Sequence, residues 1–211
     1  MRPSRESLAW TEGVVPVTDI SRVTDRVWTG GDLRSHLGDP AMLEDLAVLR
    51  SARITHVLDN RLEWSDEDFM RRYAPEITYV WNGQDDAGQA MPDSWFEKGV
   101  GFALGALAQQ DTQVLAHCHM GINRGPSMAF AILLATGENP VRALTAIRQA
   151  RPVAGLAYSA DALEWWQRAS GTADRVAKRQ RAAVAAWHRR NPAGLVRVVR
   201  RAPDLEDAAQ G

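Results

Sequence analysis

Short apolar runs and longer amphipathic stretches alternate along the chain, which predicts strands and helices in turn. The short runs predict buried strands at residues 27–29, 53–58, 77–81 and 113–117. The amphipathic stretches predict helices at residues 40–50, 66–74, 94–110, 125–136, 140–151 and 159–168. This order of elements predicts a single α/β domain with helices on both faces of its sheet.

Polar residues and prolines mark the starts of several of these helices. Asp39-Pro40 and Asn139-Pro140 each place a proline at the first helical position behind an N-cap side chain. Ser94 and Glu97 have the spacing of a capping box, in which each side chain accepts a hydrogen bond from the other residue's backbone N–H. We also expect N-caps at two serines, Ser65 and Ser159.

Composition and charge indicate an ordinary globular protein. The chain has 211 residues, of which 45% are hydrophobic and 24% charged, and its net charge is −1. That length suits one domain with an extension, and the balanced charge gives no general attraction to nucleic acid or membranes. A single cysteine excludes an internal disulfide, and no segment is apolar enough for a secretory signal or a membrane span. We therefore expect a cytoplasmic protein without a transmembrane segment.

The segment between the strand at 113–117 and the helix at 125–136 carries the candidate chemistry. Cys118, the only cysteine, and Arg124 stand there with five residues between them. A strand, a tight loop and a helix N-terminus together form an anion pocket, because backbone N–H groups and the helix dipole point inward. This field favours the thiolate of Cys118, and the planar fork of Arg124 suits phosphate oxygens. The pattern predicts a nucleophile aimed at a bound phosphate.

The sequence His117-Cys118-(five residues)-Arg124 resembles the signature loop of cysteine-dependent phosphatases, in particular the dual-specificity branch of the protein tyrosine phosphatases. Residues 20–31 and 54–59 resemble the opening strands of that family. The resemblance implies a central mixed, mostly parallel sheet flanked by helices. It also implies hydrolysis of phosphomonoesters through a cysteinyl-phosphate, without a cofactor.

The resemblance also implies residue roles. Cys118 is the expected nucleophile and Arg124 the expected phosphate clamp. Asp86, with Phe96 ten residues later, matches the spacing around the family's general acid, and Asp85 is the alternative acid because sequence does not fix the loop register. The expected phosphate-binding loop comprises His119, Met120, Gly121, Ile122, Asn123 and Arg124.

Three further positions bear on the loop. By its place in the family pattern, His117 supports the thiolate. The family carries Ser or Thr directly after the loop arginine, whereas this chain has Gly125, so either hydrolysis of the intermediate is slow or Ser127 substitutes. A zinc site at His117 and His119 is not expected, because neighbouring side chains diverge and no second Cys/His cluster follows.

The resemblance covers roughly residues 18–168 and divides the chain into three parts. We expect an N-terminal arm at 1–17, a phosphatase catalytic domain at 18–170 and a basic, partly helical tail at 171–211. The tail either packs as a solvated extension or docks a weakly bound anionic partner. Its expected anchors are Val184, Trp187, Leu195 and Val198.

The expected substrates are phosphorylated proteins, with both phosphotyrosine and phosphoserine or phosphothreonine admitted by a shallow pocket. Residues 119–123 contain no Lys or Arg, which disfavours a phosphoinositide. Two alternatives stay open: a catalytically weak or inactive phospho-binding module, and a phosphatase for RNA 5′-phosphates or phosphoinositides. Arg151 and Tyr158 follow the second helix after the loop and could border the cleft, but we expect them on the surface or in packing.

Overall fold

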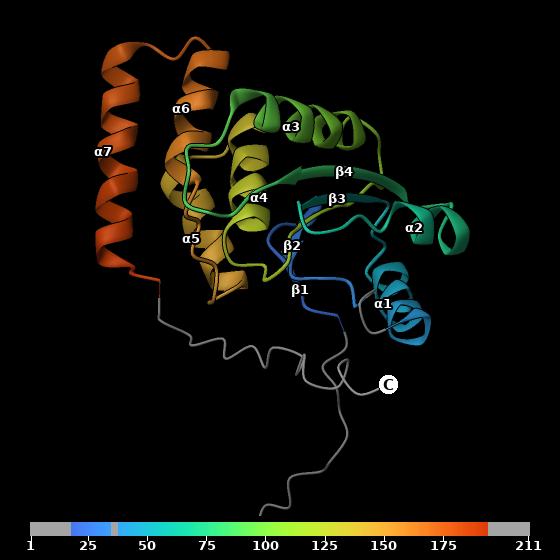
Figure 1. Ribbon diagram of the computed structural model, residues 1–211. Helices are drawn as coiled ribbons and strands as arrows, with labels where there is room; N and C mark the ends of the chain where they lie inside the picture. Colours follow the sequence, from blue (N-terminus) through green and yellow to red (C-terminus); the bar gives the residue numbers. More distant parts are fainter. Residues whose placement is uncertain (1–17, 35–37, 194–211) are drawn as a thin grey trace, which may run out of the picture.

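The computed structural model describes residues 18–34 and 38–193, so the predicted arm at 1–17 lies outside the described residues (Figure 1). The strands are β1 (Ile20–Arg22), β2 (Val27–Gly30), β3 (His56–Arg61), β4 (Thr78–Gln84) and β5 (Val114–His117). The helices are α1 (Asp39–Ser51), α2 (Glu67–Tyr73), α3 (Asp93–Leu107), α4 (Arg124–Ala135), α5 (Pro140–Ala150), α6 (Ser159–Ala169) and α7 (Asp174–Arg190).

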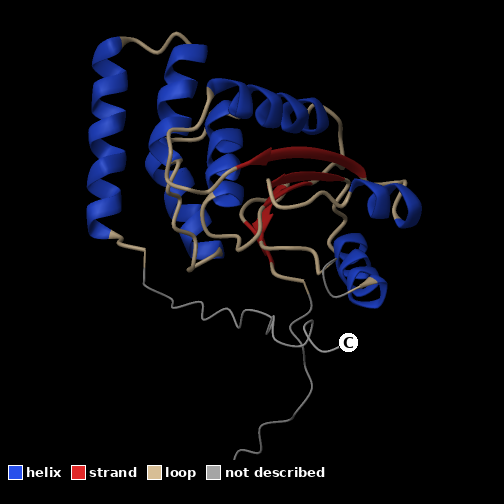
Figure 2. Ribbon diagram, in the orientation of Figure 1, coloured by secondary structure: helices blue, strands red, loops and turns tan. Residues whose placement is uncertain are grey.

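The five strands form one sheet in the order β1-β2-β5-β3-β4 (Figure 2). β1 pairs with β2 antiparallel, whereas the other three pairs are parallel. The expected mixed, mostly parallel sheet is therefore confirmed. β5 lies at its centre, and His117 at the end of β5 stands level with Gly30 of β2 and Asp59 of β3.

Helices cover both faces of this sheet, as the sequence predicts (Figure 1). α1 and α2 cover one face, where buried residues such as Leu46 and Met70 form one apolar cluster. α3, α4, α5 and α6 lie on the other face around a larger cluster. α4 is buried from Arg124 to Leu134, so the helix that follows the Cys118 loop is the central helix of the core.

β3 and β4 differ from the prediction by several residues. The strand expected at 53–58 begins at His56, because Arg53 adopts a left-handed φ of 57° and belongs to the turn after α1. It continues to Arg61, and the next strand likewise extends to Gln84. Both strands therefore end later than expected, and their polar last residues lie beside the Cys118 loop.

The predicted helix starts have mixed outcomes. Asn139 is the N-cap of α5, and its side chain accepts hydrogen bonds from the Val141 and Arg142 N–H groups at 3.0 and 3.2 Å. α3 begins at Asp93 without a side-chain cap, so the capping box expected of Ser94 and Glu97 does not form. The N-cap positions of α1, α2 and α6 are Gly38, Asp66 and Tyr158, one residue before the expected Asp39, one after Ser65 and one before Ser159, and none of the three has a side-chain cap hydrogen bond. The Ser65 hydroxyl nevertheless accepts a hydrogen bond from the Glu67 N–H at the start of α2, at 3.2 Å.

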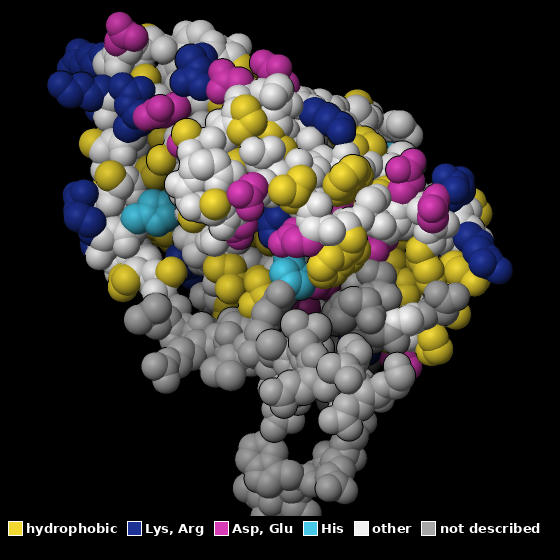
Figure 3. Space-filling view, in the orientation of Figure 1, with side chains coloured by type: hydrophobic (Ala, Val, Ile, Leu, Met, Phe, Trp, Pro, Cys, Tyr) yellow, Lys and Arg dark blue, Asp and Glu magenta, His cyan; other side chains and the backbone are white. Residues whose placement is uncertain are grey.

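The first part of the predicted tail packs on the domain as α7, beside α5 and α6 (Figure 1). Val184 and Trp187 belong to the main apolar cluster, and Trp187 Nε1 donates a hydrogen bond to Thr145 Oγ1 at 3.0 Å. Lys and Arg side chains gather over the outer side of α7, at the upper left of Figure 3. The other expected anchors, Leu195 and Val198, lie outside the described residues. No helix in the described ranges has the length and apolarity that a membrane span requires.

Replacing Trp187 with alanine is expected to lower the free energy of unfolding by about 3–5 kcal/mol, because the change opens a cavity in the main core. Chemical denaturation at neutral pH measures the loss. Val176→Ala is the matched control on the same helix, since Val176 is 36% exposed and its truncation is expected to change stability by at most about 0.5 kcal/mol. Equal stabilities for the two variants would show that α7 does not contribute to the core.

Candidate active site

The Cys118 loop lies at the carboxyl edge of the sheet, between β5 and α4. Asp32 follows β2, Glu63 follows β3 and Asp86 follows β4. Because parallel strands bring their carboxyl ends to one edge, three acidic residues from distant parts of the sequence meet the loop there.

The peptide groups of the loop have a consistent orientation. Four consecutive carbonyl oxygens accept hydrogen bonds from outside the loop, those of His119, Met120, Gly121 and Ile122. The donors are the Asp32 N–H at 3.0 Å, the Arg151 guanidinium at 3.1 and 2.5 Å, and the Gly155 N–H at 2.7 Å. Since carbonyls held outward turn the adjoining N–H groups inward, the loop has the concave lining of donors that binds anions.

Cys118 lies inside this loop and is 1% exposed. Burial raises the pKa of the Cys118 thiol above its ordinary value. Hydrogen bonds from the Gly125 and Gly121 N–H groups and the charge of Arg124 act in the opposite direction and are outweighed. The loop donors and Arg124 thus act in the direction that the sequence-based expectation of a thiolate requires, whereas desolvation of the side chain acts against it.

Arg124 spans the mouth of the loop and is itself 3% exposed. Its Nη1 and Nη2 donate to the two carboxylate oxygens of Glu63 at 2.9 and 2.7 Å, and Nη1 also donates to the Gln84 carbonyl at 2.8 Å. Partial burial raises the pKa of Glu63, but the hydrogen bonds from Arg124 and from its own backbone hold it below the ordinary value.

The third guanidinium nitrogen of Arg124, Nε, takes no part in the hydrogen bonds to Glu63 and Gln84. Within the described residues, Arg124 Nε is buried and has no hydrogen-bond partner, and Asp86 Oδ2 lies 3.6 Å from it. A buried donor without an acceptor is unfavourable. An anion in the loop would supply that acceptor.

The structure brings Asp86, rather than its neighbour Asp85, against the loop. Asn123 Nδ2 lies 3.3 and 3.4 Å from the two carboxylate oxygens of Asp86, and Tyr158 Oη donates to Asp86 Oδ1 at 2.6 Å. The Asp85 carboxylate accepts a hydrogen bond from the Asp86 backbone N–H at 2.8 Å. The register that the sequence leaves open therefore places the Asp86 carboxylate beside Arg124.

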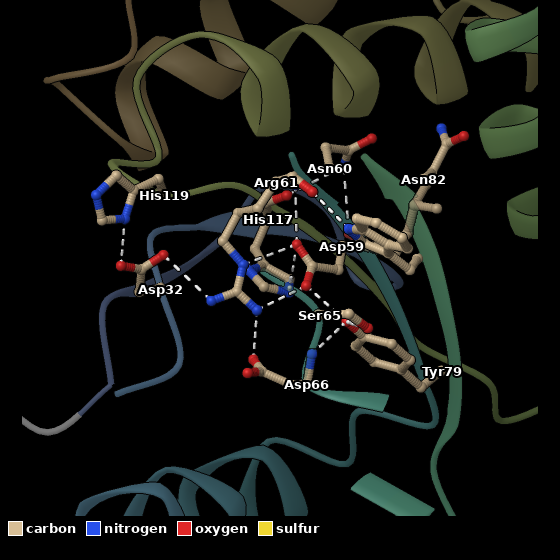
Figure 4. A network of polar contacts seen from close by, with 12 residues as sticks. Asp32, Asp59, Asn60, Arg61, Ser65, Asp66, Tyr79, Asn82, His117 and His119 are labelled. Atoms are coloured by element: carbon tan, nitrogen blue, oxygen red, sulfur yellow. Dashed lines mark hydrogen bonds and ion pairs between the residues drawn. The ribbon is translucent and has the colours of Figure 1, made fainter. Parts of the chain in front are cut away.

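A buried network of charges lies beneath the loop (Figure 4). Arg61, at the end of β3, is fully buried and pairs with Asp59 at 2.6 Å, with Asp66, and with Asp32 at 3.4 Å. Asp32 is also hydrogen-bonded to Nδ1 of His119 in the loop. The network thus joins the ends of β2 and β3 to the first residue after Cys118.

His117 is fully buried behind Cys118. In the described chain neither ring nitrogen has a hydrogen-bond partner, and Nε2 lies 3.7 Å from Asp59 Oδ1. Burial lowers the pKa of His117, and the Asp59 carboxylate only partly opposes this effect. The described residues hold no group of three or more His, Cys, Asp or Glu side chains that is arranged for a metal ion.

The departure at Gly125 has a steric basis. A Cβ there would lie 3.0 Å from the Ala116 oxygen and 3.1 Å from the Cys118 nitrogen, closer than ordinary van der Waals contact. The hydroxyl of Ser127 accepts a hydrogen bond from the Tyr158 N–H at 3.2 Å, within the core. The oxygen expected to replace the missing serine is thus bonded to the start of α6.

The sequence did not indicate Glu63, because it is one of several acidic residues after a strand. Arg151 and Tyr158 were possible residues of the cleft but were expected on the surface or in packing. Both are buried, and they also contact the site, since Arg151 donates to two loop carbonyls and Tyr158 to Asp86. Arg151 is 3% exposed and also pairs with Asp19. The structure shows that Arg151 is buried, which the sequence alone does not show.

Known proteins resemble this chain in part of its sequence and in its fold. No protein-family model matches the sequence. Mouse dual specificity protein phosphatase 26 is 29% identical over 113 residues, which cover 52% of this chain and 50% of the relative. The match thus spans about half the length of this curated relative.

Two solved structures share the fold over most of their length. A mouse putative dual specificity phosphatase complexed with zinc tungstate has a TM-score of 0.58 and 20% identity, covering 78% of this chain and 96% of that one. PTPMT1 in complex with PI(5)P has a TM-score of 0.57 and 16% identity, covering 72% of this chain and 97% of that one.

The chain therefore has the α/β fold of the dual-specificity phosphatases, as predicted. The predicted resemblance to that branch of the protein tyrosine phosphatases is also confirmed, in fold and, over about half of the chain, in sequence.

Replacing Arg61 with methionine is expected to lower the free energy of unfolding by about 3–5 kcal/mol at pH 7, because buried carboxylates lose their cation. Burial raises the pKa of Asp59, but His117 and Arg61 hold it below its ordinary value. The stabilisation from Asp59 is therefore present above its unfolded pKa of about 3.9 and is lost as pH falls through the folded pKa.

Denaturation of the Arg61→Met variant at pH 7 and again near pH 3 is expected to show a smaller loss at the lower pH. Arg71→Met is the control, because that side chain is 71% exposed in its pair with Asp68 and contributes at most about 1 kcal/mol. A loss at pH 7 no larger than that of the control would contradict the network's structural role.

Alkylation of Cys118 by iodoacetamide is expected to show a midpoint above about pH 8.5, the value of an ordinary thiol, because burial raises its pKa. Inorganic phosphate is expected to slow the reaction further by filling the loop. The control is the denatured protein, in which the same thiol titrates normally. A midpoint near pH 6 would show that the loop donors and Arg124 outweigh desolvation.

Proposed function

We propose that this protein is a cysteine-dependent phosphatase that hydrolyses phosphomonoesters on proteins. The observation that carries this proposal is the orientation of the loop, in which outward-bonded carbonyls turn a ring of N–H groups toward Cys118. Arg124 Nε, which has no hydrogen-bond partner among the described residues, adds a charged donor to the same space. A phosphate bound there would have its phosphorus opposite the sulfur.

The first step follows from this placement. The Cys118 sulfur, as the thiolate, attacks phosphorus, so that a sulfur–phosphorus bond forms while the bond to the leaving oxygen breaks. Asp86 gives its proton to that oxygen, since its carboxyl group lies beside the loop. Arg124 and the loop N–H groups stabilise the charge of the transferring phosphoryl group.

The second step releases phosphate. Asp86, now a carboxylate, takes a proton from a water molecule that attacks phosphorus, and the sulfur–phosphorus bond breaks to return Cys118 to the thiolate. Gly125 supplies no hydroxyl to assist the departing sulfur, and Ser127 is bonded to the Tyr158 N–H. We expect this second step to be the slower one.

Charge near the loop favours protein substrates over polyanionic ones. Glu63 and Asp86 both place carboxylates against Arg124, and residues 119–123 add no Lys or Arg. The further phosphates of a phosphoinositide headgroup are repelled by these carboxylates, whereas a phosphorylated side chain carries only one phosphate. The likeness to PTPMT1 in complex with PI(5)P makes phosphoinositides the natural comparison substrate.

A second candidate function is phosphate recognition without turnover. It is favoured by the buried Cys118 thiol, whose pKa is raised, and by Gly125. The loop donors would bind a phosphorylated partner equally well in that case. Turnover separates the two functions, because only the enzyme requires the sulfur and the acid.

The wild-type protein in EDTA is expected to hydrolyse p-nitrophenyl phosphate and phenyl phosphate, and Cys118→Ser to lose both activities. Asp86→Asn is expected to lower kcat/KM for phenyl phosphate, which reports the first step, by about a hundredfold, since phenolate needs a proton to leave. Asp85→Asn is the matched control and is expected to have a much smaller effect. Tight vanadate binding by a wild type that turns over neither ester would favour the recognition function.

A further inference from the structure

Tyr158 joins the loop that carries Asp86 to the core. Its hydroxyl donates to Asp86 Oδ1 at 2.6 Å and accepts from the Gly88 backbone N–H at 3.2 Å. The residue itself is 2% exposed and belongs to the main apolar cluster. One buried phenol therefore holds both the side chain of Asp86 and the backbone two residues later.

The rest of this loop is exposed and is held mainly by local contacts. Residues 85–88 are exposed, and Gly88 adopts a φ of 80°. Gln89 bonds the Ala87 N–H and the Asp85 carbonyl, at 3.0 and 2.8 Å, and both contacts stay within the loop. The Met91 N–H donates to the Asp161 carboxylate at 3.0 Å, and this hydrogen bond also connects the loop to the start of α6.

We propose that Tyr158 is a positioning residue for proton transfer by Asp86. This inference rests on the proposed function. Tyr158 acts through Asp86 and not on the substrate. Its hydrogen bond fixes Oδ1, so that Oδ2, the oxygen 3.6 Å from Arg124 Nε, faces the phosphate site.

The direction of the hydrogen bond decides which oxygen carries the proton. Burial raises the pKa of Tyr158 to about 12, so the phenol remains a donor at neutral pH. An oxygen that accepts this hydrogen bond is disfavoured as the site of the acid's own proton. The transferable proton of Asp86 is therefore directed to Oδ2, where the leaving oxygen would lie.

Tyr158→Phe tests this role, because phenylalanine keeps the ring and its packing and removes only the hydroxyl. We expect kcat/KM for phenyl phosphate, which reports the first step, to fall about tenfold, the effect of one hydrogen bond to a charged group. For p-nitrophenyl phosphate, whose leaving group needs less protonation, kcat/KM is expected to change by no more than about twofold. Tyr73→Phe, on α2, is the matched control and should alter neither rate.

The same change in the Asp86→Asn background completes the test. If Tyr158 acts through Asp86, Tyr158→Phe produces no further loss there. An equal fall in kcat/KM for both esters, a full additional fall in the Asp86→Asn background, or unchanged kcat/KM for both esters would each overturn the inference.

Failure of the proposed function has a separate signature. In that case the wild-type protein shows no turnover of either ester that Cys118→Ser removes, whatever residue stands at 158, and the inference falls with the function. Turnover that depends on Cys118 and Asp86 but keeps its leaving-group dependence in Tyr158→Phe rejects the inference alone.

Discussion

The outward orientation of four loop carbonyls is the constraint on which the rest of the site depends. Peptide groups that accept hydrogen bonds from outside leave their neighbouring N–H groups for the interior, and this arrangement makes the loop an anion site. Arg151 is the main donor, and its buried charge is balanced by Asp19. Gly121 makes the close approach possible, because it adopts a φ of 59° and a Cβ there would lie 2.3 Å from Arg151 Nη2.

Charge around the loop is balanced locally. Three buried arginines each face a carboxylate: Arg124 with Glu63, Arg61 with Asp59, and Arg151 with Asp19. Buried charges left without partners are strongly destabilising, so these pairs are a requirement for placing arginines at the edge of the sheet. They also mean that the loop attracts an anion by the directions of its donors more than by net positive charge. Acidic side chains at the centre of the face in Figure 3 agree with this description.

The sequence predicts what is local and leaves open what depends on distant contacts. The spacing of Cys118 and Arg124 and the helix after them form one continuous segment, so strand, loop and helix could all be predicted. The choice between Asp85 and Asp86 depends on Tyr158, far along the chain, and the partner of Arg124 comes from another strand. The desolvation of Cys118 is likewise not visible in the sequence, because burial is a property of the packed core and not of the loop motif.

The central claim is that Cys118 accepts the phosphoryl group within this loop. Rapid acid quench during turnover of p-nitrophenyl phosphate, followed by peptide mass spectrometry, tests it most directly. The account predicts a phosphoryl group on the peptide containing Cys118, accumulating in the steady state because Gly125 leaves the second step slow. Turnover without phosphorylation of that peptide, or with phosphorylation elsewhere, would contradict the account.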